Sequence, residues 1–252
     1  MKRVLTALVL VPVAVYSVLF APWAIFLGVV LVFACTSFHE YAAITRSFAP
    51  LGYVAGLLIL IVPPGDLGAL IFLTTLAVMC LPVFSASPES AVSRSTSLAV
   101  GILYIFGAWK CGILLHDIGP HWLMFALVVN WVGDTGAYYV GRRYGRHRLA
   151  PAISPGKSWE GAYASVASSV LFGVIYLPLA IHGMSYLKAA LLSIGANVAG
   201  QIGDLAESAI KRSAGVKDSG TMLPGHGGML DRLDSSLFAM PVLYAMLRLT
   251  TK

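Results

Sequence analysis

The chain has 252 residues, of which 58% are hydrophobic and only 11% are charged, and its mean hydropathy is +0.82. Soluble domains carry about 25% charged residues, so this composition excludes an ordinary soluble protein and indicates an all-α, polytopic membrane protein. The net charge of +6 is typical of the positive-inside bias of membrane proteins, and it gives no reason to expect a nucleic-acid partner.

A first membrane segment is predicted close to the N-terminus. Residues 1–23 resemble a signal peptide, but no clear small-x-small cleavage site precedes the next apolar run, so we expect a retained span. The cysteines all lie inside apolar segments, which argues against a disulfide framework and against a cysteine metal site. They are Cys35, Cys80 and Cys111.

Apolar segments follow one another along the whole chain. A spanning helix needs about 20 apolar residues. On this basis we predict about nine membrane segments, at about 4–20, 22–44, 51–63, 67–84, 97–115, 121–141, 161–182, 186–206 and 233–249. The segment 51–63 is short and ends in a Pro-Pro-Gly-Asp run, so it is either a half-span or one arm of a tight helical hairpin.

We predict a single integral-membrane domain over residues 1–252, with membrane segments in 1–120 and the chemistry in 121–252. Two polar loops, 142–160 and 207–232, interrupt the second part. If the N-terminus is cytoplasmic and every segment crosses, both loops and 13 of the 17 basic residues lie on the cytoplasmic side. These 13 are Lys2, Arg3, Arg46, Arg94, Arg142, Arg143, Arg146, Arg148, Lys157, Lys211, Arg212, Lys217 and Arg232.

Charge concentrates in residues 203–235, which hold five of the 11 acidic residues and four of the 17 basic residues. The acidic ones are Asp204, Glu207, Asp218, Asp231 and Asp234, and the basic ones are Lys211, Arg212, Lys217 and Arg232. A membrane chain with so few charges does not gather them in one place for packing. We therefore interpret this stretch as a metal and nucleotide-phosphate site at the membrane surface.

Helical spacing predicts how this site is assembled. Asp204, Glu207 and Lys211 lie on one stripe of a helix that leaves the membrane, and Asp231 and Asp234 share a face of the helix that re-enters. Folding of the loop between them would bring Asp204 and Asp231 together. Oxygen ligands without cysteine suit magnesium rather than zinc. The alternative for the second pair is a helix N-cap at Asp231 with Asp234 in the first turn.

The turn between these helices, residues 224–228, reads Pro-Gly-His-Gly-Gly. Such a glycine-rich turn exposes backbone amides and is able to cradle an anion around His226, Gly227 and Gly228. The four basic residues of the stretch would supply positive charge to phosphates.

A second set of polar residues lies in and before the loop 142–160. Asp134 and Tyr138 are four residues apart and share a helix face, and a carboxylate within an apolar stretch favours function over a structural ion pair. Lys157 and Ser158 follow Pro-Gly and precede a new helix, whose N-terminal amides predict a phosphate site. The spacing is not that of a Walker A motif.

Other polar residues have simpler explanations. The basic run 142–148 is explained by anchoring of the topology. His39, Glu40 and Arg46 end the second segment, where an interfacial polar collar explains them at least as well as a lipid path does. Lys110 either reaches the interface or pairs within the bundle.

The polar stretch also carries a family pattern. Ser208-Ala-Ile-Lys211-Arg212 is followed by Lys217-Asp218-Ser-Gly220 and then by Leu223-Pro-Gly-His226-Gly-Gly228-Met-Leu-Asp231-Arg232-Leu-Asp234. This pattern resembles the signature of the phosphatidate cytidylyltransferases, also called CDP-diacylglycerol synthases. Two upstream runs are similar to the family as well, namely Gly133-Asp134-Thr-Gly-Ala-Tyr138 and Ser154-Pro-Gly-Lys157-Ser158-Trp-Glu160-Gly161. The close similarity covers about residues 130–236, with a serine at 158 where the family more often has threonine.

The resemblance implies a reaction, in which CTP and phosphatidic acid give CDP-diacylglycerol and pyrophosphate for phospholipid biosynthesis. It implies dependence on Mg²⁺, optionally with a monovalent cation such as K⁺. It also implies a homodimer in the lipid bilayer of the bacterial inner membrane, with the active site facing the cytoplasm.

The family's two-aspartate metal centre matches Asp204 and Asp231. The other residues expected in catalysis are Lys211, Arg212, Lys217 and Asp234. Those expected to bind substrate are His226, Gly227, Gly228, Asp218, Arg232, Lys157, Ser158, Asp134 and Tyr138.

Three alternatives compete with this assignment. A cytidylyltransferase acting on an isoprenoid lipid phosphate stays open, because the choice of lipid chain lies in the apolar segments. An ion-coupled transporter is disfavoured, since the acidic residues collect at one surface and no internal repeat is visible. A CDP-alcohol phosphatidyltransferase is disfavoured because its D-G-x-x-A-R run is absent.

Overall fold

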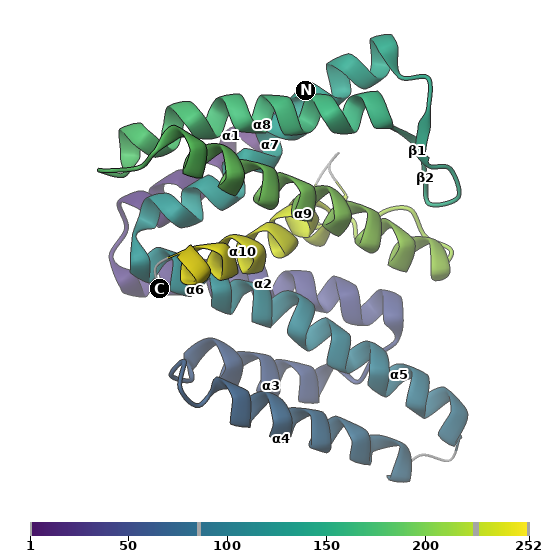
Figure 1. The fold of residues 1–252 in the computed structure, drawn as a ribbon. Helices are drawn as coiled ribbons and strands as arrows, with labels where there is room; N and C mark the ends of the chain where they lie inside the picture. Colours follow the sequence, from purple (N-terminus) through teal and green to yellow (C-terminus); the bar gives the residue numbers. More distant parts are fainter. Residues whose placement is uncertain (1, 85–86, 224–226, 251–252) are drawn as a thin grey trace.

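The structure is a computed structural model that describes residues 2–84, 87–223 and 227–250. Helices dominate it and lie side by side as a bundle, with one short strand pair at an end of the bundle (Figure 1). The helices are α1 (Lys2–Leu19), α2 (Trp23–Thr45), α3 (Ala49–Ile61), α4 (Leu67–Cys80), α5 (Pro88–Gly101), α6 (Ala108–Ile118), α7 (Pro120–Tyr144), α8 (Trp159–Ala180), α9 (Tyr186–Ser213) and α10 (Leu230–Thr250).

Two of these helices continue through irregular turns. A 3-10 turn, η1 (Leu81–Phe84), extends α4, and a π-helical segment, η2 (Ile102–Gly107), joins α5 to α6. The predicted segment 97–115 therefore lies inside one longer helical run, which begins at Pro88 and ends at Ile118.

Each predicted apolar segment coincides with a helix, which confirms a nearly all-α fold. Within the described ranges, four helical runs are long and apolar enough to cross a membrane, at 23–45, 67–84, 90–118 and 159–180. The predicted count of about nine crossings is thus not confirmed. Among the other helices, α3 is short, with 13 residues, and α9 carries the polar residues Asn197 and Gln201 in its interior.

The polar connections gather at one end of the bundle. In Figure 1 the strand pair, the C-terminal end of α9 and the N-terminal end of α5 lie at the right, whereas α6 and the C-terminus lie at the left. Both predicted polar loops, 142–160 and 207–232, leave the bundle from the same end.

A strand pair forms inside the loop 142–160, where the sequence analysis named no regular structure. β1 (Arg148–Ala150) and β2 (Ser154–Ser158) are antiparallel, and Arg148 lies opposite Ser158. The amide of Trp159 then donates to the carbonyl oxygen of His147 at 2.9 Å. The hairpin thereby returns the end of the loop to the bundle just before α8 begins.

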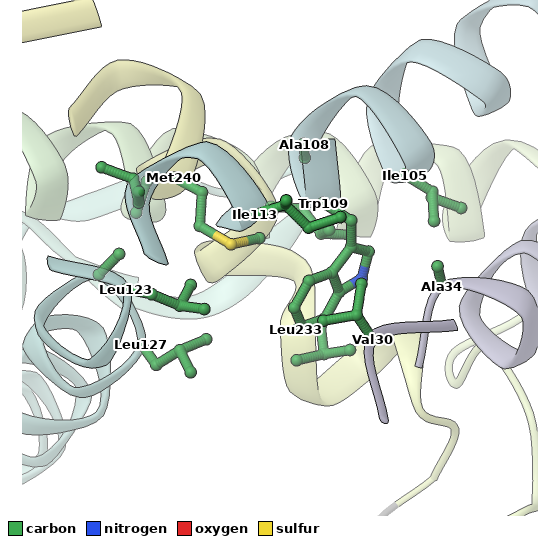
Figure 2. Packing of buried hydrophobic residues seen from close by; sticks show 14 of the residues in the cluster. Val30, Ala34, Ile105, Ala108, Trp109, Ile113, Leu123, Leu127, Leu233 and Met240 are labelled. Atoms are coloured by element: carbon green, nitrogen blue, oxygen red, sulfur yellow. The ribbon is translucent and has the colours of Figure 1, made fainter. Parts of the chain in front are cut away.

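Buried apolar side chains join the two halves of the chain into one core. Figure 2 shows part of this core, to which α2, η2, α6, α7 and α10 contribute side chains around Trp109. The outer faces stay apolar as well. On α4, for example, Phe72 is 64% exposed and Leu73 is 61% exposed. A helix that is apolar on its exposed face is suited to contact with lipid chains.

The buried lysine of α6 has a definite partner. Lys110 is 5% exposed, and its Nζ donates to the carbonyl oxygens of Leu60 at 3.0 Å and Val62 at 2.6 Å. The last carbonyl groups of a helix lack partners within that helix. Of the two possibilities that the sequence left open, Lys110 therefore pairs within the bundle, where it closes the C-terminal end of α3.

We expect the Lys110→Met variant to lose about 1–3 kcal/mol of stability, because buried carbonyl groups lose their donor. The measurement is the apparent melting temperature of detergent-solubilised protein. The matched control is Lys188→Met, at the start of α9, which should melt like the wild type. An unchanged melting temperature in Lys110→Met would show that the lysine does not hold α3.

Candidate active site

Helix α9 carries the predicted charged stripe as expected. It stays helical to Ser213, so Asp204, Glu207 and Lys211 lie on successive turns at its C-terminal end. Lys211 is only 8% exposed and Glu207 only 1%. Two charged residues at this depth need partners, because an unpaired buried charge is costly.

Lys211 joins α9 to α10. Its Nζ forms ion pairs with Glu207 and with Asp231 Oδ1, the latter at 2.5 Å. Burial by itself would lower the pKa of Lys211, but the hydrogen bonds to Asp231 and Glu207 outweigh it and raise that pKa. Burial raises the pKa of Glu207 to about 7, and the lysine only partly opposes this. The lysine thus stays charged, while Glu207 is able to take up a proton near neutral pH.

The carboxylate of Asp231 is held in one orientation. Its Oδ2 accepts hydrogen bonds from the amides of Ser219 at 2.9 Å and Gly228 at 2.8 Å, while its Oδ1 faces Lys211. Burial would raise the pKa of Asp231, but these donors outweigh burial and lower it, so the group is a carboxylate. Asp231 lies in the first turn of α10. Its carboxylate also accepts hydrogen bonds from Ser219 and Lys211, which a helix cap alone does not require.

Helices α9 and α10 approach each other closely where Asp234 lies. A Cβ atom built on Gly203 would lie 2.8 Å from the carbonyl oxygen of Asp234 and 2.9 Å from Cβ of Phe238. Only glycine permits this approach. It places Asp204, the next residue of α9, beside the first turns of α10. The carboxylate of Asp234 accepts from the amide of Ser235 at 2.6 Å.

Asp204 reaches the other polar loop. Its carboxylate forms an ion pair with Lys157 on β2. Arg212 adds a second connection, because its Nε donates to the carbonyl oxygen of Ile153 at 3.4 Å and its guanidinium donates to that of Val216 at 3.0 Å. The hairpin of the first loop and the C-terminal end of α9 therefore contact each other, and Arg212 is engaged by backbone oxygens.

A cavity of about 530 Å³ opens between α7, β2, α8 and α9. Five residues predicted for the site line it, namely Asp134, Tyr138, Lys157, Ser158 and Asp204. Arg142, Arg148 and Gln201 line it too, although the sequence analysis treated the arginines as anchors. A role for Arg148 at this cavity could have been predicted from the register of the hairpin, in which Arg148 lies opposite Ser158. The cavity is thus bordered by lysine and arginine side chains, which suits an anionic ligand.

Local hydrogen bonds fix the rim of this cavity. Ser158 is buried and caps α8, because its hydroxyl accepts from the amide of Gly161 at 3.2 Å. The carboxylate of Glu160 binds the ring of His147 at 2.7 Å and also accepts from its amide. The hydroxyl of Tyr138 accepts from Arg142 at 2.9 Å. These hydrogen bonds hold β2 and the first turn of α8 in place.

The remaining predicted residues lie around the loop 214–229. Lys217, Asp218 and Arg232 are exposed to solvent. Gly228 donates to Asp231, as described above, and the carbonyl oxygen of Gly227 accepts from the amide of Leu223 at 2.9 Å. His226 lies outside the described residues, so its predicted role stays a prediction.

The sequence analysis missed Glu40. This residue of α2 is 5% exposed, and its carboxylate accepts from the hydroxyl of Ser219 at 2.8 Å and from the amides of Met229 at 3.0 Å and Leu230 at 2.9 Å. It therefore contacts the segment that presents Asp231, whereas the sequence analysis left an interfacial polar collar and a lipid path open and proposed no such contact. The signal that could have found it is a carboxylate inside an apolar segment, which by default indicates function.

The donors available for a metal ion are carboxylate oxygens. In the part of the chain that the structure describes, no three His, Cys, Asp or Glu side chains gather as ligands. Asp204 and Asp231 each face a lysine ammonium group instead. Two carboxylates fit an ion that keeps most of its shell from water and substrate phosphates, as Mg²⁺ does.

Nearly the whole chain matches one known protein family. The model of the cytidylyltransferase family matches residues 1–250. The chain belongs to the cytidylyltransferase family. The match includes the first 120 residues, which the motifs alone did not reach.

Individual members of known function are similar over long stretches. The phosphatidate cytidylyltransferase of Pseudomonas aeruginosa is 35% identical over 260 residues, which cover 98% of this chain and 96% of that protein. The phosphatidate cytidylyltransferase of Bacillus subtilis is 44% identical over 135 residues, 54% of this chain and 50% of that protein. That of Staphylococcus haemolyticus is 39% identical over 150 residues, 60% of this chain and 55% of that protein.

Proposed function

We propose that this member of the cytidylyltransferase family transfers the CMP moiety of CTP to phosphatidic acid, giving CDP-diacylglycerol and pyrophosphate. The observation that carries the proposal is the 35% identity to a phosphatidate cytidylyltransferase over 98% of the chain. The site supports it, because a cavity bordered by Lys157, Arg142 and Arg148 adjoins a cluster of charged residues at one end of an apolar bundle.

The chemistry requires alignment more than activation. The phosphate of phosphatidic acid is already a nucleophile, so one of its oxygens attacks the α-phosphorus of CTP directly. The bond to the β-phosphate breaks, and pyrophosphate leaves with the bonding electron pair. No covalent enzyme intermediate is needed. The chain has to hold two anions together and stabilise the charge that develops on the leaving group.

Lysine and arginine side chains perform this task in the proposal. Lys157 lines the cavity and pairs with Asp204, and Lys211 pairs with Asp231. When phosphates bind, each ammonium group is able to keep its carboxylate on one side and receive a phosphate oxygen on the other. Arg148 and Arg142 extend the positive border of the cavity toward solvent.

Asp204 and Asp231 would hold Mg²⁺ in this proposal, with Asp234 and Asp218 orienting water or basic partners nearby. The ion would supply charge neutralisation at the α-phosphate and the leaving pyrophosphate. We also propose that a monovalent cation such as K⁺ acts together with Mg²⁺.

The setting is proposed from the resemblance and the charge distribution. We expect a homodimer in the bacterial inner membrane, with the site facing the cytoplasm. The asymmetry of basic residues supports this orientation, because 13 of 17 lie on one side when every segment crosses.

The test is the reaction itself. Purified protein is incubated with labelled CTP, Mg²⁺ and phosphatidate, and the lipid extract is analysed for CDP-diacylglycerol and the aqueous phase for pyrophosphate. We expect both products in equal amounts, and neither after chelation of Mg²⁺. If a CDP-lipid forms only when an isoprenoid lipid phosphate is supplied, that lipid phosphate is the substrate. If no CDP-lipid forms at all, the proposed function is wrong.

A further inference from the structure

The feature that carries a further inference is the buried carboxylate of Glu40, which lies at one end of a hydrogen-bonded relay to Asp231. Glu40 Oε2 accepts from the hydroxyl of Ser219 at 2.8 Å, and the oxygen of that hydroxyl accepts from the amide of Asp231 at 3.3 Å. The amide of Ser219 in turn donates to Asp231 Oδ2 at 2.9 Å. Ser219 thus contacts both carboxylates.

The same carboxylate holds the start of α10. Its two oxygens accept from the amides of Met229 and Leu230, which immediately precede Asp231 in the chain. The first amides of a helix lack partners within the helix, and they favour a negative charge in front of them. Within the described residues, Glu40 forms no ion pair with a lysine or arginine, and the hydrogen bonds of its carboxylate all go to Ser219 and to the start of α10.

The loop is shaped to receive Glu40. A Cβ atom built on Gly228 would lie 2.2 Å from Glu40 Oε2 and 2.1 Å from Ser219 Oγ. Any larger residue at 228 would displace the carboxylate or the hydroxyl. Glycine at this position is therefore required for the contact, in addition to the hydrogen bond that its amide donates to Asp231.

We propose that Glu40 is a positioning residue, which acts from the membrane segment α2 by holding Ser219 and the residues Met229 and Leu230 so that Asp231 faces Lys211. This inference rests on the proposed function for its catalytic consequence. Glu40 does not need to touch substrate, because in the described residues its carboxylate accepts hydrogen bonds only from the Ser219 hydroxyl and from the amides of Met229 and Leu230.

The first measurement needs no substrate and no metal. In Glu40→Gln, an amide NH₂ group replaces one acceptor oxygen and faces backbone N–H donors, so at least one hydrogen bond is lost. We expect hydrogen exchange of the Met229 and Leu230 amides to accelerate at least about tenfold, since exchange reports local opening. The matched control is Tyr41→Phe, the next residue of α2, whose hydroxyl donates to the carbonyl oxygen of Ser97 on α5 at 2.9 Å and not to this loop.

The second measurement separates positioning from general stability. Assayed well below the melting temperature, Glu40→Gln should lower kcat by about 10- to 100-fold while KM for CTP and for phosphatidate stays within about threefold, because Asp231 is displaced while the side chains that line the cavity keep their positions. Ser219→Ala removes the link but keeps Glu40, and we expect a smaller fall in kcat. The double variant should be no worse than Glu40→Gln alone, since both changes break one relay.

Several outcomes would overturn the inference. They are an unchanged kcat in Glu40→Gln, a reduced kcat with wild-type hydrogen exchange, and fully additive effects in the double variant. If Glu40→Gln does not fold, the hydrogen exchange and the kcat of Ser219→Ala test the inference instead. If the wild type forms no CDP-lipid, the proposed function fails, and the exchange experiment still tests whether Glu40 holds the loop.

Discussion

The Asp231→Asn variant should lose CDP-diacylglycerol formation by at least about 10³-fold while it still inserts and purifies. The change is close to isosteric, and the amide oxygen of asparagine can still accept from the amides of Ser219 and Gly228. It removes the charge that faces Lys211, and charge placed at the reacting groups is the main source of catalysis in such a transfer. Lys211 keeps Glu207 as a partner, so we expect the fold to survive.

The measurement is product formation from labelled CTP and phosphatidate at saturating Mg²⁺, with equal amounts of folded protein judged by gel filtration. Asp117→Asn provides the control, because Asp117 is an exposed acid near the end of α6, at the opposite end of the bundle. It should retain wild-type turnover. Near-normal turnover of Asp231→Asn would remove Asp231 from the catalytic site and, with it, the proposed pair of metal ligands.

The helices could be predicted from the sequence because each apolar run is long compared with a helical turn. The runs at 22–44 and 161–182, for example, return as α2 and α8. Local spacing also identified the charged stripe of α9, since residues on one helix face are fixed by the helical period. The apolar runs alone do not show how many helices cross the membrane. Polar residues inside a run, such as Asn197 in α9, make its helix less suited to spanning the bilayer.

Partners that are distant in the chain could not be predicted in the same way. Ser219 is 179 residues from Glu40, and no local pattern relates a carboxylate in one apolar segment to a loop near the other terminus. The ion pair of Asp204 with Lys157 was also not predicted as a pair, although both residues were selected for the site. Residue types indicated where the charged groups gather, whereas the packing of α2, α9 and α10 decided which carboxylate meets which donor.

Lys211→Met is expected to reduce both stability and activity, and the two effects can be separated. The side chain of Glu207 is 0% exposed, so removing the lysine leaves a buried carboxylate without its cation. Breaking such a pair costs about 3–5 kcal/mol. For a chain of this size that corresponds to a fall in the apparent melting temperature on the order of 10 °C.

The loss should depend on pH in a defined direction. Burial raises the pKa of Glu207 from 4.5 to about 7, and removal of Lys211 raises it further. A carboxyl group whose pKa is higher in the folded state costs no stability when it is protonated, and it becomes costly as pH rises from its unfolded pKa toward the folded one. The melting temperature of Lys211→Met should therefore lie closer to that of the wild type at pH 5.5 than at pH 8.

The double variant Lys211→Met/Glu207→Gln decides what the lysine does besides stabilising the fold. A neutral side chain at 207 no longer requires a cation, so most of the melting temperature should return, and its pH dependence should vanish. Activity should not return, because Asp231 still lacks the ammonium group that its Oδ1 faces at 2.5 Å. Glu207→Gln alone is the matched control, with turnover within about tenfold of the wild type. If the double variant recovers turnover along with stability, Lys211 serves the fold alone, and the phosphate contacts of the reaction must come from Lys157 and the arginines that line the cavity.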